Sequence, residues 1–275
     1  MRILILGSDG QIGAPLTTYL KSIGHETVEF DIFSNKNNDL RITNILDDIM
    51  VDIDFVFFLA FDVGGSTYLN KYQHTYEFID NNIKLMSSTF DTLKKYGTKF
   101  IFASSQMSNM SYSPYGVLKK IGETYTEILN GVTVKFWNVY GVEHDLTKSH
   151  VITDFILMAK NDNVIKMKTD GLEERQFLYS EDCCECLTIM MDKYDDIDRS
   201  KNLHITNFNW NRVITIAKII SKRFGNCEII KSNLTDLVQL DKRNEPDEYI
   251  LEFWTPKTSL EDGVNNIINN IINNK

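Results

Sequence analysis

The segment LILGSDGQIG, at residues 4–13, constrains the fold more than any other part of the sequence. Three glycines, Gly7, Gly10 and Gly13, lie between an apolar run that predicts a buried strand over 2–6 and a helical pattern over 11–23. Glycine permits a tight turn and lets backbone N–H groups approach an anion, and the N-terminus of the next helix carries partial positive charge. The segment therefore predicts a strand, a pyrophosphate-binding turn and a helix.

An acidic residue ends the second predicted strand. That strand covers 27–31, and its last residue is Asp31. A carboxylate at this position can accept hydrogen bonds from the adenosine ribose hydroxyls of a dinucleotide. A phosphate on the same ribose would be repelled by it, so Asp31 favours NAD over NADP as the cofactor.

The first half of the chain alternates buried strands with helical patterns. Further strands are predicted over 51–60, 99–104 and 132–139, and helices over 75–96 and 113–130. This order is typical of an α/β protein with a Rossmann-type, doubly wound parallel sheet. After Tyr140 the pattern loosens, with helices expected over 149–161 and 212–224, a strand over 202–206 and a helix in the Ile- and Asn-rich C-terminal segment.

We expect two domains. A cofactor-binding domain is predicted over 1–141 plus 177–206, and a smaller α/β substrate-binding domain over 142–176 plus 207–275, with the site in the cleft between them.

Composition excludes several classes of protein. The 275 residues carry a net charge of −9, with 43% hydrophobic and 24% charged residues, which is ordinary for a globular chain and argues against a nucleic-acid-binding protein. No apolar run approaches the roughly 20 residues that a membrane span needs, and we expect a cytoplasmic protein. Cys183, Cys184 and Cys186 crowd together, but we interpret them as small buried residues on a helix rather than as a metal site.

Tyr115 and Lys119 stand four residues apart, so a helix places both on one face. An unperturbed tyrosine hydroxyl has a pKa near ~10, and a neighbouring ammonium favours its anion. The pair suits proton transfer at a sugar hydroxyl coupled to hydride transfer. Ser104 and Ser105 end the strand that precedes this helix, and a hydroxyl there can bind the same substrate oxygen.

Together these segments resemble the extended short-chain dehydrogenase/reductases, the NAD-dependent epimerase/dehydratase family that acts on nucleotide sugars. The resemblance covers nearly the whole chain. Its motifs, in chain order, are GSDGQIG, NNDLRI, VFFLAFDVGG, FASSQ, YGVLKKIGE, FWNVYG, EERQFLYSED and RNEPDEY with WTPKTSLEDGV.

The resemblance implies a role for each matching residue. Tyr115 would be the acid/base, Lys119 would bind the nicotinamide ribose and lower the pKa of Tyr115, and Ser105 would orient the reacting hydroxyl or carbonyl. The implied cofactor contacts are Gly7, Gly10, Gln11, Ile12, Gly13, Asp31, Asp39, Leu40, Leu59, Ala60, Asn82 and Lys119. The implied substrate contacts are Ser105, Gln106, Asn138, Arg175 and Arg243, although either arginine can instead form a surface ion pair. No metal is expected.

The resemblance also bears on the reaction. The dehydratase branch carries Thr-Asp-Glu where this chain has Ser105, Gln106 and Met107, which argues against dehydration. The segments FDVGGS and NVYGVEHDLTKSHVI are similar to those of GDP-fucose synthase-like enzymes and place His150 at a catalytic acid/base position. Met107 stands where the partner cysteine of that chemistry would be, and Val142 replaces the usual proline, so His150 can equally be a substrate-contacting or structural residue.

Three interpretations follow. The first is a nucleotide-sugar epimerase that transiently oxidises C4 with bound NAD, and Asp31 favours it. The second is an NAD(P)H-dependent 4-keto nucleotide-sugar reductase, favoured by the fucose-synthase-like segments. The third is a family member that binds the cofactor without catalysis. We predict the epimerase, with a nucleotide-diphosphate sugar as substrate. The family resemblance further implies a homodimer packed through 75–96 and 113–130, where Phe78, Ile79, Ile83, Met86, Phe90 and Leu93 form an apolar pattern.

Overall fold

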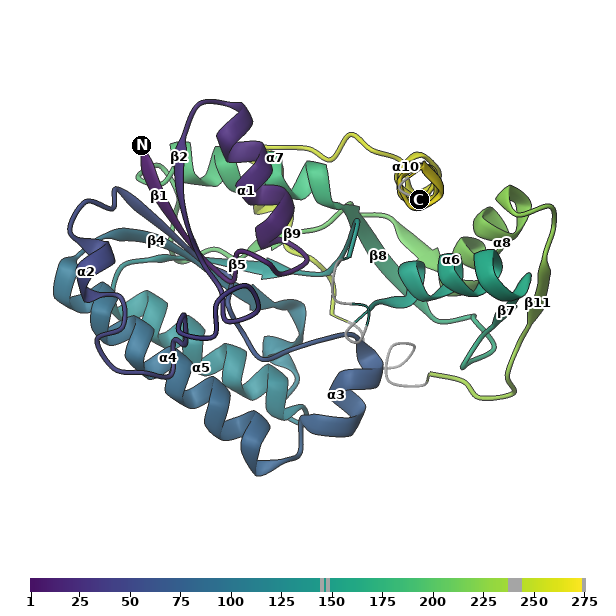
Figure 1. Ribbon diagram of the computed structural model, residues 1–275, viewed down its shortest axis with the longest axis horizontal. Helices are drawn as coiled ribbons and strands as arrows, with labels where there is room; N and C mark the ends of the chain where they lie inside the picture. The colour runs from purple at the N-terminus through teal and green to yellow at the C-terminus, as the bar shows by residue number, and fades with distance from the viewer. Residues whose placement is uncertain (144–145, 147–148, 237–243, 274–275) are drawn as a thin grey trace.

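The computed structural model, which describes residues 1–143, 146, 149–236 and 244–273, is built around a six-stranded parallel sheet (Figure 1). The strand order is β2-β1-β3-β4-β5-β9, which confirms the predicted doubly wound topology. The strands are β1 (Arg2–Leu6), β2 (Glu26–Phe30), β3 (Phe55–Phe58), β4 (Lys99–Ser105), β5 (Val132–Phe136) and β9 (Leu203–Ile205). Because all six run parallel, their carboxyl ends meet at one edge of the sheet.

Side chains of the central strands are buried on both faces of this sheet. Ile3 and Ile5 pack into one core, and Leu4 and Leu6 pack into the other. A strand between two layers of helices needs apolar residues at successive positions, and this is why β1 and β3 are continuous apolar runs in the sequence.

Two pairs of helices cover the sheet, one pair on each face (Figure 1). Helices α1 (Gly13–Ser22) and α7 (Ser180–Asp192) cover the first face, and α4 (Tyr76–Tyr96) and α5 (Pro114–Ile128) the second. Local signals set the helix ends. The side chains of Thr75 and Ser113 accept the first-turn N–H groups of α4 and α5, and α4 ends at Gly97, where φ is +64°. Shorter helices are α2 (Asp47–Met50), α3 (Ser66–Tyr72), η1 (Gln106–Asn109) and η3 (Tyr249–Glu252).

The predicted strand over 132–139 is two strands in the structure. It breaks at Trp137 into β5 and β6 (Asn138–Tyr140), and β6 leaves the large sheet to pair with β8 (Glu174–Tyr179). Strand β10 (Trp210–Arg212) completes this three-stranded sheet. The change of sheet carries Asn138 away from the central sheet and toward the second half of the molecule.

A separate hydrophobic core holds that second half together. It joins residues of β6 and β8 with those of α6 (Val151–Asp162), α8 (Val213–Arg223) and α10 (Leu260–Asn273). Strands β7 (Val164–Lys166) and β11 (Glu228–Ile230) form a two-stranded parallel sheet beside it. The predicted C-terminal helix is confirmed as α10, whose apolar residues Val264, Ile267 and Ile268 are buried. The domain boundaries stay a prediction.

The cysteine cluster lies on α7, where Cys183, Cys184 and Cys186 are buried and free. Burial raises the pKa of each thiol, so these side chains behave as small core residues. Among the described residues, no group of His, Cys, Asp and Glu side chains is arranged to hold a metal ion. Within the same residues, no helix combines the length and apolarity needed to cross a membrane.

Candidate active site

The glycine turn lies at the carboxyl edge of the sheet, between β1 and α1. Gly7 has a φ of +87°, and a Cβ placed on it would come within 2.7 Å of the Ala60 backbone N. A Cβ on Gly13 would come within 2.0 Å of the Gly7 carbonyl oxygen. Ile12, the N-cap of α1, makes no side-chain capping bond with the first turn. The turn is therefore closed to larger residues and presents a helix N-terminus to an anion, which fits the pyrophosphate of a dinucleotide.

Asp31 follows β2 and lies beside the glycine turn, as predicted. Its carboxylate accepts the Asp9 N–H at 3.0 Å and the Phe33 N–H at 2.8 Å. A carboxylate offers about four acceptor positions, so two amides do not exhaust it. The position suits an acceptor of ribose hydroxyl hydrogen bonds.

The two predicted adenine contacts differ in their surroundings, because Asp39 pairs with an arginine and Leu40 is buried in the core. The Asp39 carboxylate is held by the Arg41 guanidinium at 2.8 Å, and hydrogen bonding with Arg41 holds the pKa of that carboxyl below its usual range. Leu40 is buried in the core beneath α4. Both residues lie in the chain segment that follows β2 and the Asp31 turn.

Asn82, a completely buried residue of α4, holds the loop after β3 by side-chain hydrogen bonds. The Asn82 side chain accepts the Asp62 N–H at 2.8 Å and donates to the Asp62 carbonyl at 3.2 Å and the Phe78 carbonyl at 2.9 Å. Both amide hydrogens are therefore used. Asn82 thereby holds the loop in which Leu59 and Ala60 adjoin the glycine turn, and its contact with the cofactor stays a prediction.

Tyr115 and Ser105 meet at the end of β4. Tyr115 lies in the first turn of α5, which begins at Pro114, and its side chain is 9% exposed. The Ser105 hydroxyl caps η1 by accepting the Met107 N–H at 3.2 Å and also shares a hydrogen bond with the Tyr115 side chain. Burial raises the pKa of Tyr115 to about 12, although the bond with Ser105 lowers it. A nearby positive charge is needed for this hydroxyl to ionise near neutral pH.

Lys119 lies one helical turn after Tyr115 and points to the same region. Its Nζ donates to the Ala103 carbonyl at 2.6 Å and lies 3.7 Å from the centroid of the Phe61 ring. Burial lowers the pKa of Lys119 to about 7, although the Glu123 carboxylate raises it. Phe61 also packs edge-on against Tyr115, with the ring centroids 5.7 Å apart. The predicted trio of Ser105, Tyr115 and Lys119 is thus brought together in one buried cluster.

Glu123 is a further member of this region that the sequence analysis did not single out. Its carboxylate accepts the Ser104 hydroxyl at 2.6 Å and lies 3.4 Å from Lys135 Nζ, both partners being buried. Burial raises the pKa of the Glu123 carboxyl, but the bonds from Ser104 and the lysines outweigh it and hold the pKa below its usual range. The sequence spacing could have indicated Glu123, because Tyr115, Lys119 and Glu123 follow one another at intervals of four residues and so share one face of α5.

The residues that were predicted to contact the substrate are held by longer-range contacts. Asn244 donates to the Gln106 side-chain oxygen at 2.9 Å and thereby ties the C-terminal segment to η1. Asn138 donates to the Gln176 carbonyl at 3.1 Å. The sequence analysis chose Arg243, which lies outside the described residues, and missed its neighbour Asn244.

Arg175 is a mostly buried cation on β8, as a diphosphate-binding residue would be. Its guanidinium donates to the Asp236 carboxylate at 2.7 Å and to the Glu174 carbonyl at 2.9 Å. Burial lowers the pKa of Arg175, and Asp236 opposes that effect. A phosphate group that bound here would exchange with the Asp236 carboxylate for the same donors.

His150 forms a pair with Glu143 at the start of α6. The His150 Nδ1 lies 2.5 Å from a Glu143 carboxylate oxygen, and the His150 N–H donates to the other oxygen at 3.0 Å. The Glu143 side chain is 6% exposed and that of His150 is 38% exposed, so the carboxylate holds a ring whose remaining edge reaches solvent. Gly65, in the loop that carries Phe61, packs so closely against the backbone of Ser149 and His150 that a Cβ on it would collide with the Ser149 carbonyl. His150 therefore lies beside that loop.

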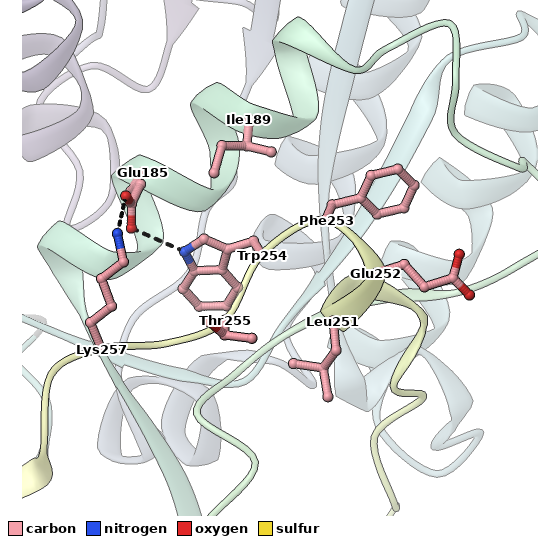
Figure 2. A pocket seen from close by; sticks show the side chains of 8 residues that line it. All are labelled: Glu185, Ile189, Leu251, Glu252, Phe253, Trp254, Thr255 and Lys257. Atoms are coloured by element: carbon pink, nitrogen blue, oxygen red, sulfur yellow. Dashed lines mark hydrogen bonds and ion pairs between the residues drawn. The ribbon is translucent and has the colours of Figure 1, made fainter.

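A pocket of about 280 Å³ lies elsewhere, between α7 and residues 251–257. Figure 2 shows the side chains that line it. Glu185 bridges Lys257 and the Trp254 indole across it. None of the residues that line it belongs to the predicted site, so we assign no cofactor or substrate to it.

Comparison with known proteins defines the family. Residues 3–206 match the model of the NAD dependent epimerase/dehydratase family, and the chain belongs to that family. UDP-glucuronic acid decarboxylase 1 of Xenopus tropicalis is 23% identical over 97% of this chain and 71% of its own length. The uncharacterized UDP-glucose epimerase YtcB of Bacillus subtilis is 24% identical over 98% of this chain and 97% of its own length.

Solved structures show the same fold. The UDP-glucose 4-epimerase of Thermotoga maritima, solved with UDP-glucose, superposes with a TM-score of 0.86 at 21% identity, covering 99% of both chains. The epimerase Mth375 of Methanothermobacter thermautotrophicus gives a TM-score of 0.85 at 19% identity, covering 99% of this chain and 92% of its own. Bound NAD is present in another neighbour, MoeE5, solved with UDP-glucose.

Proposed function

We propose that this protein is an NAD-dependent epimerase that inverts C4 of a nucleotide-diphosphate sugar. The observation that carries the proposal is the cluster of Ser105, Tyr115 and Lys119 at the same sheet edge as the glycine turn. Similarity to proteins described as UDP-glucose and UDP-galactose epimerases supports the substrate class. Inversion at C4 requires one proton-transfer residue, an oriented hydroxyl and a cofactor held nearby, and this cluster supplies the protein's share.

NAD, when bound, accepts a hydride from a sugar carbon and can return it. The protein's part is to move the proton. Tyr115 Oη takes the proton from the C4 hydroxyl as the C4 hydride leaves. The resulting 4-ketosugar turns over, and Tyr115 gives the proton back to the C4 oxygen as the hydride returns to the opposite face of C4. Ser105 holds the same oxygen through a hydrogen bond. Lys119, when protonated, stabilises the Tyr115 anion and lowers a pKa that burial alone raises to about 12.

In this proposal, residues on the substrate side bind the parts of the nucleotide-diphosphate sugar that do not react. Arg175 exchanges its Asp236 partner for the diphosphate, and Asn138 and Gln106 face the sugar. A guanidinium fork grips two phosphate oxygens at once, which anchors the diphosphate while the sugar turns over beside Tyr115. Holding the reacting groups in the right geometry in this way supplies much of the rate enhancement.

The first experiment identifies the nucleotide that the purified protein carries. The denatured protein is expected to release NAD in a 1:1 ratio, measured by mass spectrometry and absorbance. UDP-, GDP-, dTDP- and CDP-sugars are then screened for C4 inversion by NMR. Recovered NADP would contradict the cofactor assignment, and an empty protein that turns over only with added NADH would replace the epimerase with the reductase.

The pair of Glu143 and His150 favours that second candidate, a 4-keto nucleotide-sugar reductase with fucose-synthase-like features. A carboxylate-oriented imidazole can transfer a proton at a carbon next to a ketone, a step that simple C4 inversion does not need. Incubation with substrate in D₂O distinguishes the two. Ring deuterium in the wild type that is absent with His150→Asn supports a fucose-synthase-like form of the second candidate, and reduction of a 4-ketosugar by added NAD(P)H without ring deuterium supports a simple reductase. C4 inversion without deuterium supports the first candidate.

We further propose a homodimer through α4 and α5, with a corrected contact surface. Phe78, Met86, Phe90 and Leu93 face the chain's own core. Ile83 of the predicted pattern is exposed, and the other exposed apolar residues of these helices are Tyr76, Val117, Ile121, Tyr125 and Ile128. Light scattering on the variant Ile121→Glu/Ile128→Glu is expected to show a monomer where the wild type shows a dimer, and a monomeric wild type would refute the proposal.

A further inference from the structure

Glu123 is a buried acid that the mechanism above does not use. It lies between α5 and the sheet and is 7% exposed. One carboxylate oxygen accepts the Ser104 hydroxyl at 2.6 Å. The other accepts the Lys120 ammonium at 3.0 Å and lies 3.4 Å from Lys135 Nζ. A carboxylate is costly to bury, and these partners balance its charge.

Two consecutive residues of β4 hold two consecutive turns of α5. The Ala103 carbonyl accepts the Lys119 ammonium at 2.6 Å, and the Ser104 hydroxyl donates to Glu123. Between these turns, Gly122 packs so closely on β4 that a Cβ on it would come within 2.3 Å of an aromatic ring of that strand. The bond from Ser104 therefore helps to fix the position of α5 along β4, and with it the position of the Lys119 ammonium.

Among the described residues, Glu123 supplies the negative charge that acts on Lys119. The elements packed around the ammonium otherwise present uncharged groups, which are the Ala103 carbonyl, the Phe61 ring and the Tyr115 side chain. Burial lowers the pKa of Lys119 to about 7, and the Glu123 carboxylate opposes that effect. Without this carboxylate, the ammonium would lose its proton at a lower pH.

Two further titratable side chains lie beyond Glu123 in one row across the sheet. Ser104, Lys135 and His204 are paired neighbours on β4, β5 and β9. Burial and the Lys135 charge lower the pKa of His204 to about 4, although Asp247 opposes them, so this imidazole is neutral at pH 7. Glu123 is therefore the acid that serves two buried lysines, one on β5 and one on its own helix.

We propose that Glu123 is a positioning residue that holds the Lys119 ammonium in place and in its charged form beside Tyr115. The inference rests on the proposed function, in which Lys119 stabilises the Tyr115 anion. A neutral amine cannot stabilise a phenolate, so the site loses its acid/base strength as Lys119 loses its proton. Removal of the Glu123 charge is therefore expected to reduce activity more strongly as the pH rises.

Three substitutions separate the charge of Glu123 from its shape. Glu123→Gln keeps the length of the side chain and an oxygen that can accept the Ser104 hydroxyl, but removes the charge. Glu123→Asp keeps the charge on a side chain that is one methylene shorter. Glu127→Gln is the matched control, because Glu127 lies one turn further along α5 and is exposed. If Glu123 only fixes the position of α5, Glu123→Gln behaves as the wild type.

A double variant guards against misfolding of Glu123→Gln, which leaves the buried Lys135 without its ion-pair partner. Glu123→Gln/Lys135→Met removes both charges and replaces the lysine with an apolar side chain of similar length, a change that proteins often tolerate. Glu123 rather than Lys135 is the charge that acts on Lys119, so both variants are expected to change Lys119 in the same direction.

The first measurement is the pH titration of Lys119 by NMR, on the full chain labelled with ¹³Cε-lysine and freed of any bound nucleotide. The Lys119 signal is identified by its absence from Lys119→Met. In Glu123→Gln the titration midpoint is expected to fall by about one pH unit below that of the wild type, and in Glu123→Asp by less. Glu127→Gln is expected to titrate as the wild type does.

The second measurement is the pH dependence of kcat/KM for C4 inversion. With midpoints near 7 in the wild type and one pH unit lower in Glu123→Gln, the charged fraction of Lys119 differs about twofold at pH 6 and about tenfold at pH 8. The activity of Glu123→Gln is expected to follow these ratios, and Glu123→Asp to recover part of the loss. A displaced helix would instead lower the activity by the same factor at every pH.

An unchanged Lys119 midpoint in Glu123→Gln would overturn this inference and leave the proposed function intact, and the double variant decides the question if the single variant does not fold. If the midpoint falls but the wild type inverts no nucleotide sugar at C4, the proposed function fails and the control of Lys119 by Glu123 stands.

Discussion

The cofactor side and the substrate side of this site are built in different ways. On the cofactor side, the glycine turn, Asp31, Ser105, Tyr115 and Lys119 all belong to the ends of parallel strands or to the helices that follow them. On the substrate side, Arg175 and Asn138 depend on partners far away in the sequence. The first region is fixed by regular structure, and the second by individual side-chain contacts between separate segments.

That difference has a functional consequence. A sheet edge and a helix N-terminus hold their shape whether or not a ligand is bound, so the cofactor side is preorganised. Arg175 instead holds Asp236, which it would release if it binds the substrate diphosphate as proposed. The chemistry can therefore stay constant across relatives while the substrate changes, because substrate contacts can be rebuilt without disturbing the strand ends.

The largest expected effect comes from Tyr115 on the cofactor side. Tyr115→Phe removes the hydroxyl that moves the proton and is expected to lower kcat by about 10²- to 10⁴-fold, the usual contribution of a positioned acid/base. NAD affinity and melting temperature should change little, because the ring and its contact with Phe61 remain. Tyr76→Phe, at a tyrosine that is 74% exposed, is the matched control. Retention of most activity in Tyr115→Phe would remove the cofactor-side cluster from the mechanism.

A smaller effect, on KM rather than kcat, is expected on the substrate side. Arg175→Met removes a charged donor for the diphosphate and should raise KM by about 10- to 100-fold, the range expected for hydrogen bonds to a charged group. Asp236→Asn should lower KM by about two- to fivefold, because it weakens a competing pair worth up to about 1 kcal/mol. Steady-state kinetics on both variants measures these two changes in KM.

Opposite changes in KM would show that substrate and Asp236 compete for Arg175. Equal KM values in wild type and Arg175→Met would instead mean that the arginine is a structural ion pair, the alternative that its sequence left open.

Sequence alone predicted the local structure of the proposed cofactor side, for a physical reason. Gly7 and Gly13 are required because their Cβ positions coincide with backbone, and Tyr115 and Lys119 share a face because a helix repeats every 3.6 residues. Both requirements are local, so a short motif expresses them. The doubly wound parallel sheet followed from the same regular alternation of strands and helices.

The substrate side could not be predicted in the same way. Asp236 is 61 residues from Arg175, and Asn244 is 138 residues from Gln106. No periodicity links such residues, and only the folded chain brings them together. The pair of Glu143 and His150 is closer in sequence, but it is formed across an irregular segment where no helix or strand spacing applies. The family resemblance singled out His150 as a candidate, whereas its pairing with the Glu143 carboxylate was visible only in the structure.

The smallest expected effect concerns the stability of the cofactor-free protein and tests the burial of Lys119. Burial lowers the pKa of Lys119 to about 7, well below its usual value of about 10.4. Between these two values the unfolded chain binds a proton at this lysine and the folded protein largely does not. The free energy of unfolding of the wild type must therefore rise with pH across this window, relative to a variant without the group.

Lys119→Met provides that variant. The wild-type free energy of unfolding minus that of Lys119→Met is expected to increase from pH 7 to pH 9, by at most about 1.4 kcal/mol per pH unit. Urea unfolding at several pH values measures it. Lys94→Met, at an exposed position of α4, should give no slope. A flat difference for Lys119→Met would mean that Lys119 stays protonated before NAD binds, and that the cofactor side is preorganised in charge as well as in shape.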